Sequence, residues 1–230
     1  MNELIIIPAY NEEGNIQKVV DNLIRNYPEY DYVIINDGSK DKTAEICRRN
    51  CYNYIDLPVN LGLAGGFRAG MKYAQRNGYD AAIQFDGDGQ HDPKYIKKMI
   101  EVMLNEKMDI VIGSRFINEH RPRSLRMFGN ILIEGCILIT TGRKIKDPTS
   151  GMRIYNKRMI EKLANTINYG PEPDTLAYLI RCGAKVKEVQ VDMHEREAGE
   201  SYLNSIRSME YMLHMILSIL IIQWFRKKGL

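Results

Sequence analysis

Short apolar runs alternate with longer amphipathic stretches along the first half of the chain. The runs are rich in β-branched residues and occupy residues 4–7, 32–35, 54–56, 81–85 and 110–112. Between them, apolar residues recur with helical spacing, in segments that end near residues 24, 49, 77 and 104. Continuous apolar runs are typical of strands covered on both faces. The alternation therefore predicts an α/β fold, with a mainly parallel, Rossmann-like sheet and helices on both of its faces.

The pattern changes after residue 116. Periodicity predicts helices over residues 127–139 and 174–182, a strand that ends near residue 155, and another strand over residues 186–191. The last 20 or so residues are strongly apolar up to Phe225 and then basic. A chain of 230 residues is long enough for one domain with a substantial core and an appendage.

Polar clusters follow four of the predicted strands. They occupy residues 10–12, 36–39, 60–66 and 86–90. Open parallel sheets bind ligands beyond the carboxyl ends of their strands, so we expect these clusters to converge on one edge. The third cluster is a predicted glycine-rich loop, but it lacks the G-x-G-x-x-G spacing of dinucleotide sites and the Gly-Lys-Ser/Thr of a P-loop. The alternative is that the four clusters are scattered solvated loops. This interpretation is the weaker one, because all four clusters follow a predicted strand.

The fourth cluster carries two carboxylates, Asp86 and Asp88, with Gly87 between them. Mg²⁺ is often held by one or two carboxylates and completes its shell with substrate phosphates, so this stretch predicts a metal–diphosphate site. A calcium loop is the first alternative. It fails because His91 replaces the glycine at its sixth position and Lys97 replaces the glutamate at its twelfth. A phosphatase with an aspartate nucleophile is disfavoured, since such sites usually follow the first strand.

Composition and charge narrow the class of protein further. Hydrophobic residues make up 44% and charged residues 27%, which is typical of neither a disordered chain nor a polytopic membrane protein. The net charge of +3 is too small and too dispersed to indicate nucleic-acid binding. The four cysteines show no zinc or redox spacing, so we expect reduced thiols. Residues 1–3 lead straight into the first strand, and we expect no signal peptide and a cytoplasmic location.

Seven short motifs occur in order along the chain. They are PAYNE (residues 8–12), NDGS (36–39), NLG (60–62), DGDGQHDP (86–93), GSR (113–115), DPTSGMR (147–153) and R-x-x-G-x-S (196–201). In this order and spacing they resemble the motifs of the family 2 glycosyltransferases, which have the GT-A fold. The resemblance covers nearly the whole chain. It is closest to the branch of dolichol-phosphate mannose synthases and bacterial polyprenyl-phosphate relatives.

This resemblance implies that residues 1–118 bind a nucleotide-diphosphate sugar. The residues that would contact the nucleotide sugar are Pro8, Ala9, Tyr10, Glu12, Asp37, Gly62 and Asp86. The ligands of Mg²⁺ or Mn²⁺ would be Asp88, Gln90 and Asp86. Such a metal would neutralise the diphosphate leaving group as the glycosidic bond breaks.

The resemblance also implies that residues 119–204 bind the acceptor, and that residues 1–204 form one GT-A domain. Arg115 and Arg196 are similar to arginines that act near the donor and acceptor phosphates, where a guanidinium binds oxygens with two parallel hydrogen bonds. Arg126, Ser150 and Glu172 would contact the acceptor. For Arg126, a solvated surface position is an equally good interpretation.

The chemical nature of the acceptor stays open at this stage. A phosphate nucleophile is already anionic, whereas a sugar hydroxyl needs a general base. Asp174 lies where many relatives in the wider family carry that base, and it would support in-line attack with inversion; an N-cap is the alternative role. Tyr202 stands where the lipid-phosphate branch usually has lysine, which weakens the case for a lipid-phosphate acceptor.

The apolar end of the chain, residues 205–230, predicts a separate C-terminal helix. Its 15 or so mostly apolar residues are fewer than the roughly 20 needed to cross a bilayer. We favour an interfacial helix with Trp224 and the basic residues 226–228 at the headgroup level, on the inner face of the plasma membrane. A dimer interface and a helix that completes the core are the alternatives.

Taken together, the residues predict an inverting, metal-dependent glycosyltransferase that moves a sugar from a nucleotide-diphosphate sugar to a polyprenyl-phosphate-linked or other cell-envelope glycan acceptor. A sugar-phosphate nucleotidyltransferase is the second enzyme class, but its Gly-rich, Arg-containing loop is unlike residues 8–12. An inactive nucleotide-sugar-binding or scaffold domain is the non-enzyme alternative. It predicts a damaged acidic motif, and residues 86–90 are intact.

Overall fold

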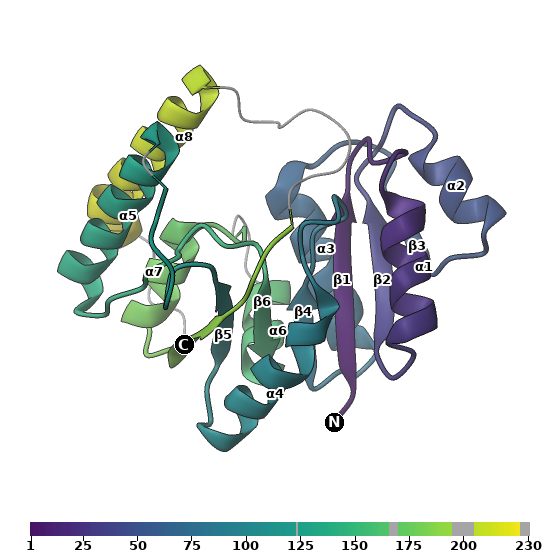
Figure 1. Ribbon diagram of the computed structural model, residues 1–230, viewed down its shortest axis with the longest axis horizontal. Coiled ribbons are helices and arrows are strands. Elements are labelled where there is room, and N and C mark those ends of the chain that lie inside the picture. Colours follow the sequence, from purple (N-terminus) through teal and green to yellow (C-terminus); the bar gives the residue numbers. More distant parts are fainter. Residues whose placement is uncertain (123, 166–169, 195–204, 226–230) are drawn as a thin grey trace.

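A computed structural model describes residues 1–122, 124–165, 170–194 and 205–225; of residues 125–126 and 205–209 it describes the backbone alone. Within these residues, a seven-stranded sheet runs through the centre of the molecule in the order β3-β2-β1-β4-β6-β5-β7 (Figure 1). The strands are β1 (Glu3–Ala9), β2 (Asp31–Asn36), β3 (Tyr54–Asp56), β4 (Ala81–Gln84), β5 (Ile110–Ser114), β6 (Arg153–Asn156) and β7 (Val186–Gln190). They coincide with the predicted strands to within a few residues.

Strand β6 runs antiparallel to both of its neighbours, β4 and β5, whereas the other pairings in this sheet are parallel. Its first residue, Arg153, pairs with Gln84 near the end of β4 and with Ile112 in β5. The loop that enters β6 therefore reaches the edge where the parallel strands end, which is the edge that binds ligands in open α/β sheets. The predicted mainly parallel, Rossmann-like sheet is confirmed.

Helices cover both faces of the sheet (Figure 1). The described helical segments are α1 (Ile16–Asn26), α2 (Thr43–Arg49), α3 (Gly62–Arg76), η1 (Pro93–Tyr95), α4 (Ile96–Asn105), α5 (Leu125–Thr141), α6 (Lys157–Asn165), α7 (Pro173–Arg181), α8 (Ser205–Leu217), η2 (Ser218–Ile222) and α9 (Gln223–Phe225). One face packs against α1 and α4, and the other packs against α3, α6 and α7.

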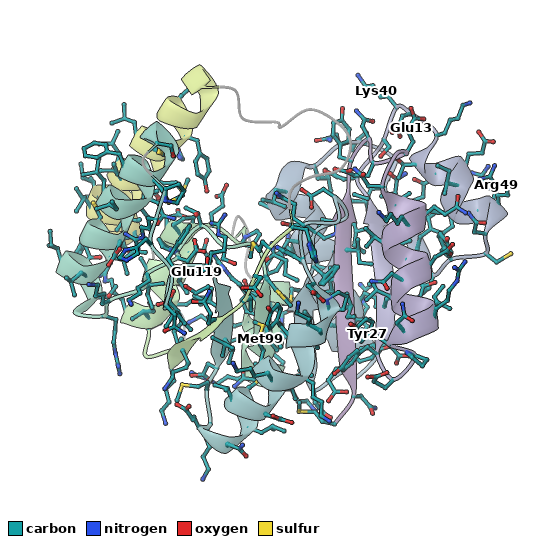
Figure 2. The ribbon with its side chains drawn as sticks, in the orientation of Figure 1. Glu13, Tyr27, Lys40, Arg49, Met99 and Glu119 are labelled. Atoms are coloured by element: carbon teal, nitrogen blue, oxygen red, sulfur yellow. The ribbon has the colours of Figure 1, made fainter. Side chains whose placement is uncertain are left out.

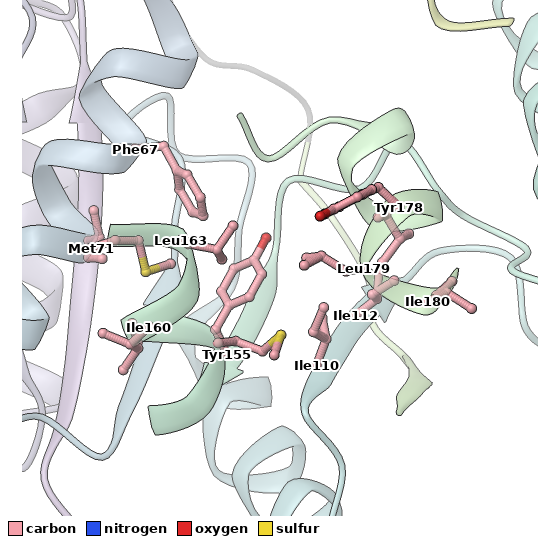
Figure 3. Close-up of a cluster of buried hydrophobic side chains, with 14 of the residues drawn as sticks. Phe67, Met71, Ile110, Ile112, Tyr155, Ile160, Leu163, Tyr178, Leu179 and Ile180 are labelled. Atoms are coloured by element: carbon pink, nitrogen blue, oxygen red, sulfur yellow. The ribbon is translucent and has the colours of Figure 1, made fainter. Parts of the chain in front are cut away.

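The two hydrophobic cores explain why the strands are continuously apolar. In β1, Leu4 and Ile6 enter the core beneath α3, while Ile5 and Ile7 enter the core beneath α1. Burying each such side chain contributes about 1.5–3 kcal/mol relative to exposure. Figure 3 shows part of the first core, where Phe67 of α3 lies near Tyr155 of β6, with 5.5 Å between their ring centroids.

Two boundaries differ from the sequence prediction. The first strand was expected over residues 4–7, but β1 continues through Pro8 to Ala9. Residues 60–66 were expected to form a loop, but α3 begins at Gly62. Its glycines allow close packing on the sheet: a Cβ on Gly70 would lie 2.3 Å from Cγ2 of Ile6. The helix α6 (Lys157–Asn165) was not predicted at all.

The C-terminal segment α8–η2–α9 lies beside α5 (Figure 1). Met215 and Ile219 are buried in the core that also holds residues of α5 and α7. One side of the segment therefore completes the core, as one of the three interpretations held. Other large apolar side chains of α5 and of this segment are exposed: Phe128, Ile131, Leu132, Leu138, Ile139, Leu213, Leu217, Leu220, Ile221, Ile222, Trp224 and Phe225. In the described part of the chain, no helix has the length and apolarity to cross a bilayer.

Candidate active site

The two carboxylates of the acidic motif lie just beyond the end of β4. Both Asp86 and Asp88 are half-buried, and Oδ1 of Asp88 accepts a hydrogen bond from the backbone N–H of Gln90 at 3.1 Å. The loop that enters β6 closes over Asp86, because a Cβ on Gly151 would lie only 2.5 Å from its Oδ2. Only glycine fits at residue 151 without displacing this carboxylate. The reversed direction of β6 thus joins the DPTSGMR motif to the acidic motif.

The loops after β1 and β2 are fastened together at the same edge of the sheet, where Glu13 and Lys40 mark them in Figure 2. Three backbone amides of the first loop donate to side chains of the second: Asn11 to Ser39 Oγ at 3.0 Å, Glu12 to Thr43 Oγ1 at 2.9 Å, and Glu13 to Asp41 Oδ2 at 3.0 Å. The second loop donates in return from Lys40 to Asn11 and from Lys42 to Glu13. This bracing fixes the backbone around Tyr10 and Glu12, two of the predicted nucleotide contacts.

Asp37, in the second predicted cluster, is linked to the end of β1 directly before the first cluster and to the third cluster. Its backbone N–H donates to the carbonyl of Ala9 at 2.9 Å, and its Oδ1 accepts from the backbone N–H of Leu61 at 2.7 Å. A Cβ on Gly87 would lie 3.3 Å from the carbonyl oxygen of Pro8, which brings the acidic motif to the same place. The structure therefore gathers the four polar clusters on one edge of the sheet, as their positions after the strands predicted. Tyr10 is exposed beside them, and Gly62 begins α3.

Arg115 directly follows β5, and its side chain is held by Asp147. Its Nε donates to Oδ2 of Asp147 at 2.7 Å, its Nη2 to Oδ1 at 2.8 Å, and its backbone N–H to Oδ2 at 3.1 Å. Burial alone would raise the pKa of Asp147, but the hydrogen bonds and charge of Arg115 outweigh burial and hold that pKa below its ordinary value of 3.8. Burial would lower the pKa of Arg115, and Asp147 raises it instead. The guanidinium is therefore a fixed positive charge at this edge.

Phe116 lies between two arginines. The guanidinium carbons of Arg115 and Arg121 are 5.0 and 5.6 Å from the centroid of its ring, within cation–π range. Arg121 also donates to Glu134 of α5 and to the carbonyl of Lys146. The end of β5, the middle of α5 and the loop before β6 are thereby connected around Arg115.

The predicted acceptor residues lie in different settings. Ser150 is buried, and its hydroxyl donates to the carbonyl of Gly113 at 2.5 Å. Glu172 is the N-cap residue of α7, without a capping hydrogen bond from its side chain. Arg126 lies in the first turn of α5, and its side chain is outside the description; Arg196 lies entirely outside the described residues.

Asp174 lies within the first turn of α7, so the interpretation of this residue as an N-cap is wrong. It is only 3% exposed. Its Oδ1 accepts from the backbone N–H of Thr175 at 2.6 Å, and its Oδ2 accepts from the hydroxyl of Ser218 at 2.7 Å. Ser218 belongs to η2, so the C-terminal segment is joined directly to the predicted acceptor half.

Two further residues at this edge carry no role in the sequence prediction. Asp147 positions Arg115, and the buried His91 contacts Asp86. Both stand inside the recognised motifs DPTSGMR and DGDGQHDP. Their membership of these motifs was the available signal, but their partners are visible only in the folded chain.

The donors at the acidic motif fit a hard divalent cation. Asp86 and Asp88 offer carboxylate oxygens, and Gln90 offers an amide oxygen. The three residues follow one another at intervals of two along one loop. Across the described ranges, no cluster of three or more His, Cys, Asp or Glu side chains forms a ready-made cage. Mg²⁺ and similar ions bound by one or two carboxylates take their remaining ligands from water and substrate phosphates, which suits an open loop of this kind.

Comparison with known proteins decides the family. Residues 4–164 match the model of glycosyl transferase family 2. The chain belongs to this family. This family 2 glycosyltransferase is 32% identical to the UDP-N-acetylglucosamine–dolichyl-phosphate N-acetylglucosaminyltransferase of Methanococcus voltae, over 71% of the chain and 72% of that relative. It is 27% identical to the undecaprenyl-phosphate mannosyltransferase of Micrococcus luteus, over 89% of the chain and 88% of that relative.

Solved structures show the same fold for this glycosyltransferase. It superposes on the glucosyl-3-phosphoglycerate synthase of Mycobacterium tuberculosis, crystallised with Mn²⁺, uridine diphosphate and phosphoglyceric acid, with a TM-score of 0.70. The match covers 98% of the chain and 79% of that protein at 14% sequence identity. The GT-A-like sheet and its helices are therefore shared, although the sequences have diverged widely.

Proposed function

We propose that this glycosyltransferase moves a sugar from a nucleotide-diphosphate sugar to a polyprenyl phosphate, with inversion at the anomeric carbon. The observation that carries the proposal is the convergence of Asp86 and Asp88 with the loops after β1 and β2 on one sheet edge. Membership of family 2, whose relatives include polyprenyl-phosphate sugar transferases, supports it.

The first half of the chain supplies the donor site in this proposal. Asp37 accepts hydrogen bonds from the base, and Tyr10 and Glu12 stand beside it on the braced loops. Asp86, Asp88 and Gln90 hold Mg²⁺ or Mn²⁺, which when bound neutralises charge on the diphosphate. The use of a metal is supported by the donor set and by the Mn²⁺ and uridine diphosphate found in the structural neighbour.

The acceptor site is formed by residues 119–204 together with Arg115, at the border of the two halves, in this proposal. Arg115, with its charge fixed by Asp147, attracts the phosphate that attacks the sugar, and Arg126 and Arg196 contribute further positive charge. A phosphate nucleophile needs no general base. This suits Asp174, because its carboxylate already accepts hydrogen bonds from Thr175 and Ser218.

Contact with a membrane fits an acceptor that carries a lipid. The exposed apolar residues of α5 and of the C-terminal segment, named above, form what we call the apolar surface. In the sequence, Arg143 and Lys144 follow the end of α5, and the basic residues 226–228, which lie outside the described residues, follow α9. Apolar area combined with basic residues is what interfacial binding to anionic lipids requires. We propose that this surface rests on the bilayer and brings the acceptor site to the lipid phosphate.

A thermal-shift screen of nucleotide sugars, with and without Mn²⁺, tests the donor site. The cognate donor is expected to raise Tm more with Mn²⁺ than without it, and Asp88→Asn is expected to lose the Mn²⁺-dependent part. The matched control is Asp80→Asn, at a residue that precedes β4 rather than following it. If a donor raises the Tm of the parent protein and of Asp88→Asn equally, with and without Mn²⁺, the metal role of Asp88 is wrong.

A further inference from the structure

His91 is buried directly behind the acidic loop. Its side chain is 2% exposed, and its ring meets Phe85 edge-to-face with 5.3 Å between centroids. A short antiparallel bridge to Met193 fixes its backbone, and the N–H of His194 donates to the carbonyl of Gln90 at 2.9 Å. The histidine therefore has one defined position relative to the loop that precedes it.

Both ring nitrogens of His91 face Asp86. Nδ1 accepts the backbone N–H of Asp86 at 2.9 Å. A ring nitrogen that accepts a hydrogen bond carries no proton, so the neutral ring has its proton on Nε2. Nε2 lies 3.4 Å from Oδ2 of Asp86, which places that N–H toward the carboxylate. One side chain thus reaches the backbone and the carboxylate of the same residue, five positions earlier.

The acidic loop needs such a support because glycine separates its functional residues. Gly87 and Gly89 leave the backbone many accessible conformations, and Gly89 adopts a φ of +81°. A hydrogen bond made during folding removes that freedom before any ligand arrives. Gly151 packs against the same carboxylate oxygen of Asp86, as described above.

We propose that His91 is a positioning residue that fixes Asp86 for the metal-bound diphosphate through its Nδ1 acceptor. The inference rests on the donor-site role of Asp86 given under the proposed function. Residues that orient a metal ligand without touching the metal typically change metal affinity by about 10–100-fold when they are replaced.

Two substitutions separate the hydrogen bond from packing. In His91→Asn the side-chain oxygen takes the place of Nδ1 and can still accept from Asp86. In His91→Phe the ring contact with Phe85 is kept, but the acceptor is lost. His194→Asn is the matched control, because the side chain of His194 is 62% exposed and is near Asp92 rather than Asp86.

Sugar transfer is measured against Mn²⁺ concentration, together with kcat and Tm. His91→Phe is expected to raise the Mn²⁺ concentration for half-maximal activity at least about tenfold, with Tm little changed. His91→Asn and His194→Asn are expected to stay within about threefold of the parent protein. If His91→Phe fails to fold, His91→Gln replaces it, since its amide reaches only the Nε2 position. The proposal is overturned if the variant without a hydrogen-bond acceptor at the Nδ1 position needs the same Mn²⁺ concentration for half-maximal activity as the parent protein.

Nitrogen NMR of the imidazole gives a readout that does not depend on activity. We expect an unprotonated Nδ1 and a protonated Nε2 in the full chain, and a proton on Nδ1 contradicts the assignment. Absence of transfer by the parent protein would count against the proposed function while leaving this tautomer unaffected. Normal transfer with an unchanged Mn²⁺ requirement in His91→Phe counts against the role of His91 alone.

Discussion

Replacing Asp147 by asparagine tests the buried pair that holds Arg115. The asparagine has nearly the same shape, so packing is preserved while the negative charge is removed. The side chain of Asp147 is 0% exposed and that of Arg115 is 26% exposed. The variant therefore leaves a largely buried guanidinium without its counter-ion.

The cost follows from the geometry of the pair. Removing one partner of a buried ion pair typically costs about 3–5 kcal/mol, because the remaining charge stays desolvated. Water reaches one side of Arg115, so we expect the lower end, about 3 kcal/mol. For a chain of this size each kcal/mol lowers Tm by about 2–4 °C, which gives a decrease of roughly 6–12 °C.

Urea denaturation and thermal melting measure this effect. Glu106→Gln is the matched control, since the Lys187–Glu106 pair has a similar N–O distance of 2.9 Å but side chains that are 49% and 42% exposed. An exposed pair of this kind contributes under about 1 kcal/mol. If Asp147→Asn loses no more stability than Glu106→Gln, the buried pair does not stabilise the fold as argued.

Four other outcomes are expected. Folding lowers the pKa values of Asp41 and Asp147, so both carboxylates stabilise the folded chain fully at pH values above 3.8, their ordinary pKa. This stabilisation is lost as the pH falls through the lowered pKa values. Urea denaturation at about pH 3 should show a smaller loss of stability in Asp147→Asn than in the parent protein. Gly151→Ala should displace Asp86 and lower kcat by about 100-fold, and unchanged kcat would show that the loop yields without moving the carboxylate. Ser218→Ala should cost about 1–3 kcal/mol in urea denaturation by removing the hydrogen bond from Ser218 to Oδ2 of the buried Asp174, and no loss contradicts that contact. Ile139→Asp should weaken binding to anionic vesicles in co-sedimentation with little change in Tm, whereas undiminished binding removes the apolar surface from the membrane contact.

The sheet was predictable because buried parallel strands have a strong local signal. Residues 4–7 are continuously apolar since they serve two cores at once, and the same holds for residues 110–112. The direction of β6 has no such signal. Residues 153–156 (Arg-Ile-Tyr-Asn) form a short stretch with two apolar residues between polar ones, and only the folded sheet shows that they pair with β4 and β5 on either side.

The start of α3 was missed because glycine has a low intrinsic helix propensity. Tertiary packing overrides that preference here, since Gly70 allows the helix to approach β1 closely. The convergence of the polar clusters, in contrast, follows from topology alone. Each stands after a strand, and parallel strands end at one edge.

Contacts between distant residues explain the rest of what the sequence did not predict. Asp147 contacts Arg115, which is 32 positions away in the sequence, and Ser218 contacts Asp174, which is 44 positions away. Neither contact produces a periodic pattern or a motif spacing by which it could be recognised in the sequence. His91 is close to Asp86 in sequence, but the direction of its ring depends on the bridge to Met193 from beyond β7.

Transfer of a labelled sugar from its nucleotide-diphosphate donor to a polyprenyl phosphate is the most direct test of the proposed function. The parent protein is expected to form a lipid-soluble, labelled product in the presence of Mg²⁺ or Mn²⁺, and Asp88→Asn is expected to form almost none. Asp174→Asn should retain the activity if the nucleophile is a phosphate. A product that forms only on a sugar hydroxyl and is abolished in Asp174→Asn would contradict the phosphate acceptor, and a product formed equally by Asp88→Asn would contradict the donor site.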